Sequence, residues 1–163
     1  MKPLTKLPAV VALLAAAGCQ TTQAPVAQER DVTVTPFLMF QDGRAEEAIN
    51  HYIEVFGDGS VIFVKWYGPN GVGPEGSIQH AAFEIHGQRI MVTESPVEHV
   101  FGFTPSVSMF VDFDSAEELD RVFHALSEGG EVMMPLGSYF FADRFAFIQD
   151  RFGVSWQLHM LTE

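Results

Sequence analysis

Two stretches of the chain place apolar residues three or four positions apart, the spacing of an amphipathic helix. These residues are Ala45, Ala48, Ile49, Tyr52, Ile53 and Phe56 in the first stretch and Leu119, Val122, Phe123 and Leu126 in the second. Ser115 followed by Glu118 forms a capping box, which predicts where the second helix begins. Glycines at 57 and 59 and at 129 and 130 predict where the two helices end.

Runs rich in Val, Phe and Thr flank both predicted helices and indicate strands. One run precedes each helix and three follow it. The runs cover residues 32–40, 61–67, 78–85 and 89–94 in the first half, and 107–113, 131–135, 145–149 and 155–161 in the second. Residues 86–88 and 150–153 are predicted turns. Both halves therefore have the order βαβββ.

The two halves also resemble each other residue by residue. A shift of 71 residues aligns 45–48 (AEEA) with 116–119 (AEEL) without a gap, and Tyr52 then falls on Phe123. The sequence thus predicts an α+β domain over residues 32–163, built from tandem βαβββ modules at about 32–100 and 104–163. We expect its two sheets to curl around a central groove, each backed by its helix.

The N-terminal residues have the pattern of a targeting signal. Lys2 and Lys6 flank an apolar run at 7–17, which is shorter than the ~20 residues of a transmembrane helix. The small residues before Cys19 resemble the lipobox of bacterial lipoproteins, which implies cleavage after residue 18 and lipidation of Cys19. The alternative is an ordinary secretory signal with an incidental cysteine. Residues 19–31 are polar and predict a flexible tether.

This resemblance implies a location in the bacterial cell envelope. Gln20 follows the cysteine where Asp would retain such a lipoprotein at the inner membrane. We therefore expect a lipid anchor in the outer membrane, with the domain facing the periplasm.

Charge and cysteine content exclude several classes of protein. The chain has 163 residues, with nine Lys and Arg against 21 Asp and Glu, and a net charge of −12. Its few basic residues are scattered, so no surface suited to a phosphate backbone is expected, and nucleic acid is not an expected partner. A single cysteine excludes an intramolecular disulfide and a zinc-finger cluster.

Several motifs together resemble the vicinal oxygen chelate superfamily, which includes glyoxalases and bleomycin-resistance proteins. They are the doubled βαβββ order, residues 35–40 (TPFLMF) leading to AEEA at 45–48, and residues 144–156 (RFAFIQDRFGVSW). Within the superfamily the chain looks most like the PhnB-like group, whose members are labelled demethylubiquinone methyltransferases. The sequence does not support that activity, because it has no Gly-rich turn between a strand and a helix for a methyltransferase cofactor.

The resemblance also indicates where a metal would bind. Metal-using members take ligands from the first and last strands of each module, usually His or Gln and then Glu. Counting from the helices and the hairpin glycines places these positions at Thr35, Met91, Ser106 and Gln157. None of the four is an imidazole or a carboxylate, so we expect neither a metal nor another cofactor.

The histidines leave a relocated metal site open as an alternative. His80 and Glu84 are four positions apart on a predicted strand, about 13 Å, which is too far to share an ion. Glu84 and His86 would provide two ligands at most. With further ligands, the protein would be a metal-dependent lyase, isomerase or dioxygenase of the same superfamily.

The expected groove gives the preferred functional hypothesis, a site for a small apolar or aromatic molecule. Its candidate lining residues are aromatic or polar and lie on the inner strands or adjoining loops: Trp66, Tyr67, His80, Tyr139, Arg144, Trp156 and Gln157. The alternative is that aromatic members such as Trp156 belong to the core. The loop 68–76, which holds four glycines and two prolines, is placed to gate this groove.

A homodimer is the expected assembly. Two half-open sheets leave edges that must be covered or paired, and members of the resembling family commonly dimerise. The apolar segment 101–105 between the modules is the stretch that we expect a second copy to shield. Alternatively, this segment folds onto the core of its own chain.

Overall fold

The computed structural model describes residues 32–161, and the residues from Val34 onward form one compact unit. The predicted signal peptide and the whole predicted tether, including Cys19, lie outside the described residues. Within the described part, no helix is long and apolar enough to cross a membrane.

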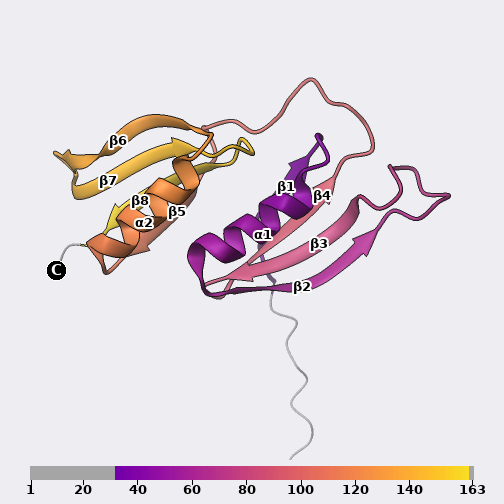
Figure 1. The fold of residues 1–163 in the computed structure, drawn as a ribbon, viewed down its shortest axis with the longest axis horizontal. Helices are drawn as coiled ribbons and strands as arrows, with labels where there is room; N and C mark the ends of the chain where they lie inside the picture. Colours follow the sequence, from indigo (N-terminus) through magenta and orange to yellow (C-terminus); the bar gives the residue numbers. More distant parts are fainter. Residues whose placement is uncertain (1–31, 162–163) are drawn as a thin grey trace, which may run out of the picture. The chain divides into compact units, whose positions relative to one another are not determined.

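The first module is a four-stranded sheet with one helix (Figure 1). Its elements are β1 (Phe37–Phe40), α1 (Ala45–Phe56), β2 (Gly59–Trp66), β3 (Ile78–Ile85) and β4 (Gln88–Glu94). The strand order is β1-β4-β3-β2, with β1 parallel to β4 and the other neighbours antiparallel. His86 and Gly87 both have positive φ, as a two-residue hairpin turn between β3 and β4 requires.

The second module repeats this topology. Its elements are β5 (Met109–Phe113), α2 (Ala116–Ser127), β6 (Glu131–Tyr139), β7 (Ala142–Gln149) and β8 (Ser155–Met160). Its sheet has the order β5-β8-β7-β6, again with only the outer pair β5 and β8 parallel. The predicted α+β fold of two tandem βαβββ modules is confirmed.

The first strand of each module is shorter than predicted. Val32 and Val34 are 93% and 89% exposed and pair with no strand. The ladder with β4 begins at Phe37, because Pro36 has no N–H to donate and only its carbonyl accepts, from Met91. In the second module β5 begins at Met109. Thr35 therefore lies before β1 and Ser106 before β5, although the count from the helices assigns both to the first strands.

Local signals fix the helix ends as predicted at three of the four termini. The Ser115 hydroxyl accepts from the Glu118 N–H at the start of α2. Gly57 adopts φ 70° at the end of α1, and its N–H donates to the Ile53 carbonyl. Gly129, with φ 72°, follows α2.

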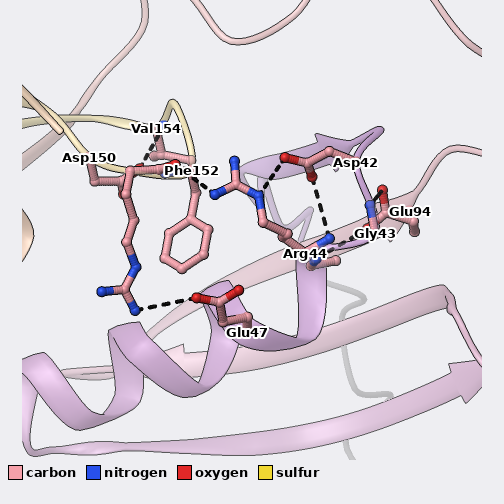
Figure 2. A network of polar contacts seen from close by, with 10 residues as sticks. Asp42, Gly43, Arg44, Glu47, Glu94, Asp150, Phe152 and Val154 are labelled. Carbon is pink, nitrogen blue, oxygen red and sulfur yellow. Dashed lines mark hydrogen bonds and ion pairs between the residues drawn. The ribbon is translucent and has the colours of Figure 1, made fainter. Parts of the chain in front are cut away.

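The start of α1 is held by a tertiary contact. The buried Glu94, at the end of β4, accepts from the N–H groups of Gly43 and Ala45 (Figure 2). A carboxylate is favourable there because the first N–H groups of a helix have no partner within the helix.

Each sheet has one face covered by its helix. Alternation along the strands turns Leu38, Phe83 and Val92 into the core, where they pack with Ile49 and Tyr52 of α1. The opposite faces stay open and carry exposed aromatic side chains, with Phe37 and Phe63 on the first sheet and Phe110 on the second.

The core continues from one module into the other. The Trp156 ring of β8 lies 5.1 Å from Tyr52 and 5.3 Å from Phe56, both on α1. On α2, Arg121 donates to the Val55 carbonyl at 2.7 Å. The turn between β7 and β8 is joined to the first module too, since Arg44 donates to the Arg151 carbonyl (Figure 2).

Candidate functional site

A pocket of about 250 Å³ lies where the strands β1, β5 and β8 begin. Its walls come from Phe37 and Leu38 of β1, linker residues 102–104, residues 107–109, and Val154 and Ser155. These residues come from both modules and from the segment that joins them. Most of the lining surface is apolar, as a site for a small organic molecule requires.

Ser155 is the polar group in this pocket that has no partner. The residue is 2% exposed, and its hydroxyl makes no hydrogen bond with any residue that the structure describes. Because Trp156 points into the core, alternation along β8 turns the Ser155 side chain to the opposite face. Leaving a buried hydroxyl without a partner costs about 1–3 kcal/mol. The Ser155 oxygen has almost no accessible surface, so neighbouring atoms also cover it on the side of the pocket.

Ser108 provides a second hydroxyl beside the pocket, but this one is engaged. Its Oγ accepts a hydrogen bond of 2.8 Å from the Gln157 side-chain amide. Gln157 follows Ser155 by two positions on β8, so both side chains point to the open face. The predicted site residue Gln157 thus holds a wall residue of the pocket in place.

A buried carboxylate fixes the turn that carries Val154 and Ser155. Asp150 Oδ1 accepts from the N–H groups of Phe152 and Val154, at 2.8 and 3.0 Å. Asp150 Oδ2 accepts from the Tyr52 hydroxyl and the Trp156 indole, both at 2.8 Å. Burial raises the pKa of Asp150, although all four hydrogen bonds act to lower it. Because Tyr52 belongs to α1, Asp150 also joins the two modules.

Cation contacts surround the same turn (Figure 2). The guanidinium groups of Arg44 and Arg151 lie 5.2 and 5.0 Å from the centre of the Phe152 ring. Arg151 also pairs with Glu47 of α1 at 3.5 Å. The pocket wall that the turn provides is therefore supported from both modules.

The linker closes the pocket on another side. Phe103 is half-buried against the core, 5.1 Å from the Phe40 ring, and the Phe101 carbonyl accepts from Gln41. Phe101 itself remains 59% exposed. The alternative given for segment 101–105, that it folds onto its own chain, holds for Phe103.

The predicted groove residue His80 lies on the open face of the first sheet. The His80 ring stacks on Phe63 with ring centres 5.9 Å apart and lies 5.6 Å from Phe37, which lines the pocket. Trp66, at the end of β2, is 43% exposed. Tyr139 lies at the other end of the second sheet, among Phe141 and Phe145.

Three other predicted groove residues do not line an open face. Trp156 is 1% exposed and packs against α1, which bears out its alternative assignment to the core. Arg144 forms an ion pair with Asp120 of α2, so it lies on the helix side of β7. Tyr67 is buried beneath its own Gly-rich loop. In each case a neighbouring element covers a side that sequence reasoning takes to be open.

The sheet register does not pair the four positions that the resemblance indicates for a metal, Thr35 with Met91 and Ser106 with Gln157. Phe37 pairs with Met91, and Phe110 pairs with Gln157. Thr35 and Ser106 lie two and four residues before these places. The two distances differ because the loop before α1 has four residues and the loop before α2 has two. Two Phe, a Met and a Gln do not form a donor set for a divalent ion. In residues 32–161, no three His, Cys, Asp or Glu residues gather closely enough to hold one.

Comparison with known proteins decides the family. The family described as 3-demethylubiquinone-9 3-methyltransferase matches residues 32–159, nearly the whole described domain. The chain belongs to this PhnB-like family. A PhnB protein of Bacillus cereus, itself described as a putative 3-demethylubiquinone-9 3-methyltransferase, is 44% identical, with a TM-score of 0.77 over 80% of this chain and 100% of that one.

Two further relatives extend the comparison beyond this PhnB protein. Protein YjdN of Escherichia coli is 26% identical over 80% of this chain and 96% of its own length. The fosfomycin resistance protein FosX of Listeria monocytogenes is 17% identical, with a TM-score of 0.56 over 80% of this chain and 93% of that one. At that identity the likeness to FosX shows a shared vicinal oxygen chelate fold.

Sequence reasoning misses the residues that build the pocket. Ser155 lies in a predicted strand, Phe103 in the segment between the modules, and Val154 between a predicted turn and that strand, and the sequence does not group them into one site. A weak signal exists at Ser155, which is a lone hydroxyl between the apolar residues Val154 and Trp156. Only the pairing of β5 with β8 brings this hydroxyl beside the linker.

Proposed function

We propose that this member of the PhnB-like family binds a small, largely apolar molecule in the pocket at the start of β1, β5 and β8, without a metal. The observation that carries the proposal is the pocket itself, about 250 Å³ in volume, whose mostly apolar walls come from both modules and from the linker. Such walls favour apolar groups, because these groups are removed from water when they bind.

The family description does not by itself make the chain a methyltransferase. In the described domain the strand-to-helix loops are residues 41–44 and 114–115, and neither has the glycine pattern that cradles a nucleotide cofactor. Both sheets are mostly antiparallel, whereas that type of cofactor site needs a parallel sheet crossing into helices. Binding is the function that the geometry supports best.

Blocking the pocket tests this proposal. Val107 lines the pocket and is 77% exposed, so Val107→Trp adds bulk at the site without filling the core. Val100→Trp is the matched control, because Val100 is fully exposed and is not a pocket residue. With benzyl alcohol as the probe, we expect amide NMR shifts of residues 102–109 and 154–155 in the wild type and Val100→Trp, and their loss in Val107→Trp. Equal shifts in all three proteins would contradict the proposal.

We further propose that the protein is lipid-anchored through Cys19 in the bacterial cell envelope, facing the periplasm from the outer membrane. The support is the lipobox-like sequence before Cys19 and the residue Gln20 after it. Cys19→Ser should leave the domain folded and release it from the membrane fraction. A variant that stays in that fraction would show that the cysteine is not the anchor.

We also propose a homodimer that covers the open sheet faces. The first face carries Phe37 and Phe63 beside Lys65, and the second carries Phe110 beside Asp112. We propose that the first face of one copy packs against the second face of the other copy. The aromatic side chains would then be buried, and the opposite charges beside them would attract each other.

A further inference from the structure

We propose that Asn70 is a site of spontaneous chemical modification, at which the side-chain amide is lost and the residue becomes aspartate or isoaspartate. Asn70 lies in the loop between β2 and β3 and is followed by Gly71. Both residues are exposed, in a turn that begins at Gly68. The inference is independent of ligand binding in the pocket and of the proposed membrane anchor.

The reaction needs only these two residues and water. The Gly71 backbone nitrogen, once it has lost its proton to hydroxide, attacks the Asn70 Cγ atom. The new N–Cγ bond closes a five-membered succinimide ring, the Cγ–Nδ2 bond breaks, and ammonia leaves with a proton from water. A water molecule then opens the ring at either carbonyl and gives aspartate or isoaspartate. Glycine favours the attack, because no side chain crowds its nitrogen and its backbone turns freely.

The chain has three dipeptides in which Asp or Asn precedes Gly. They are Asp42-Gly43, Asp58-Gly59 and Asn70-Gly71. A carboxylate is ionised near neutral pH and resists attack by a nitrogen anion, whereas the Asn70 amide is neutral. The side-chain chemistry therefore favours Asn70, and the backbone contacts of the three glycines increase the difference.

The glycines of the two Asp-Gly pairs are held by the fold. The Gly43 N–H donates to the buried Glu94 carboxylate at 2.9 Å (Figure 2), and this negative charge opposes loss of the proton. Gly59 begins β2 and pairs with Ile85, and a Cβ atom on Gly59 would lie 2.6 Å from the Glu84 carbonyl oxygen. A backbone packed this closely has little freedom to rotate toward the preceding side chain.

The nitrogen of Gly71 is engaged in a surface turn instead. Its N–H donates to the Gly68 carbonyl at 2.9 Å, and both residues are exposed. A turn bond between exposed groups opens at low free energy, and opening releases the nitrogen for attack. The structure thus leaves one of the three pairs free to react.

The modification changes the loop in two ways. Either product adds a negative charge to a chain whose net charge is −12. Isoaspartate also lengthens the main chain by one methylene group within the turn, so the hydrogen bond from Gly71 to Gly68 loses its geometry.

Ageing the full-length chain at 37 °C, at pH 7 and at pH 8, tests the proposal. Peptide mapping by mass spectrometry locates the new acid, and isoaspartyl methyltransferase detects isoaspartate. We expect Asn70 to convert about tenfold faster at pH 8, because the deprotonated fraction of the backbone nitrogen rises tenfold per pH unit. Asn50, the other asparagine of the chain, lies within α1 before His51 and should stay intact.

A variant and a denaturant separate the chemistry from the fold. Asn70→Gln should yield no acid at this position over the same period, because closing a six-membered ring is much slower. In urea, isoaspartate should form at Asp42 and Asp58 as well, because their glycines are then released.

Three outcomes would overturn the inference. The first is an Asn70 that stays intact in the folded protein but converts in urea, since the fold would then protect the turn. The second is equal loss of the amide at Asn50. The third is isoaspartate at Asp42 or Asp58 that forms in the folded chain as fast as at Asn70, or no additional isoaspartate at those two residues in urea.

Discussion

The Asp150 carboxylate connects more parts of the chain than any single apolar contact described above. It is 3% exposed and accepts four hydrogen bonds, from its own turn, from β8 and from α1 of the other module. A buried acidic group is stable in such a place only when its oxygens are satisfied. The turn therefore depends on one residue for both its shape and its attachment.

Replacing this carboxylate with an amide should destabilise the domain. In Asp150→Asn, one oxygen becomes an N–H₂ group, which cannot accept from the Trp156 indole or the backbone N–H groups. We expect a loss of about 1–3 kcal/mol in the free energy of unfolding in urea, the usual cost of an unpaired buried group. Asp143→Asn, at an exposed position on β7, should change the free energy of unfolding by less than about 0.5 kcal/mol. Equal effects of the two substitutions would contradict this role.

His51 on α1 provides a prediction about pH. Burial, and then the positive charge of Arg151, lower the pKa of His51 below its ordinary value of 6.5; Asp150, Glu47 and Glu54 oppose the shift. Between the lowered pKa and 6.5 the folded protein binds fewer protons than the unfolded chain. The free energy of unfolding should therefore fall through this group as the pH drops below about 6.5.

The comparison of variants isolates His51 from other titrating groups. Asp150 acts in the opposite direction, because its raised pKa makes its contribution decline as the pH rises above its ordinary value of 3.8. Urea unfolding at pH 5 and pH 7.5 should show a smaller pH dependence in His51→Gln than in the wild type. Asn50→Gln, at an exposed position of the same helix, removes no titratable group and should leave the pH dependence unchanged. If His51→Gln keeps the pH dependence of the wild type, the His51 side chain does not contribute to the change of stability with pH.

At the scale of elements, the loop between β2 and β3 is closed onto one side chain. The N–H of Tyr67 donates to the Ser77 carbonyl, and the N–H of Gly76 donates to the Tyr67 carbonyl. The Tyr67 ring is buried, and a Cβ atom at Gly73 would lie 2.5 Å from its Cε2 atom. The glycine therefore permits the backbone to pass directly over the ring.

Adding one methyl group at this crossing should strain the loop. We expect Gly73→Ala to lower the free energy of unfolding by about 1–3 kcal/mol, the usual cost of overpacking. Gly68→Ala is the matched control in the same loop, because its Cβ would meet no atom within 4 Å. Urea unfolding of both variants checks the prediction. Similar stability of the two would show that the loop moves freely away from Tyr67.

For the whole molecule, the open sheet faces lead to a prediction of assembly. Phe37 and Phe110 occupy matching register positions in the two modules and are 51% and 56% exposed. Each lies about 5.5 Å from a histidine ring, His80 in one sheet and His159 in the other. Exposed aromatic groups repeated in this way favour burial against a second copy.

Light scattering on residues 32–163 should give about twice the chain mass. Phe110→Glu should shift the mass toward that of one chain, because it places a charge in the proposed contact. Val100→Glu, at a fully exposed linker position, is the control and should leave the dimer intact. A wild-type mass of one chain at every concentration would end the proposal.

The sequence by itself determined the elements and their order. Both helices, all eight strands and the doubled βαβββ plan follow from signals that act over a few residues: apolar spacing, the Ser115 cap, and the Gly57 and Gly87 turns. Such signals depend on local backbone geometry and not on distant partners. The sequence also puts His80 and Gln157 on strands, but only as candidates for the lining of a groove.

Only the tertiary structure decided which faces are covered and which residues meet. Trp156 and Arg144 lie on the helix side because α1 and α2 pack there, and no local pattern distinguishes the two faces of an aromatic-rich strand. Phe37 pairs with Met91 because the strand register depends on loop lengths and long-range hydrogen bonds. The pocket at Ser155 needs both modules and the linker together, so it exists only once the chain has folded.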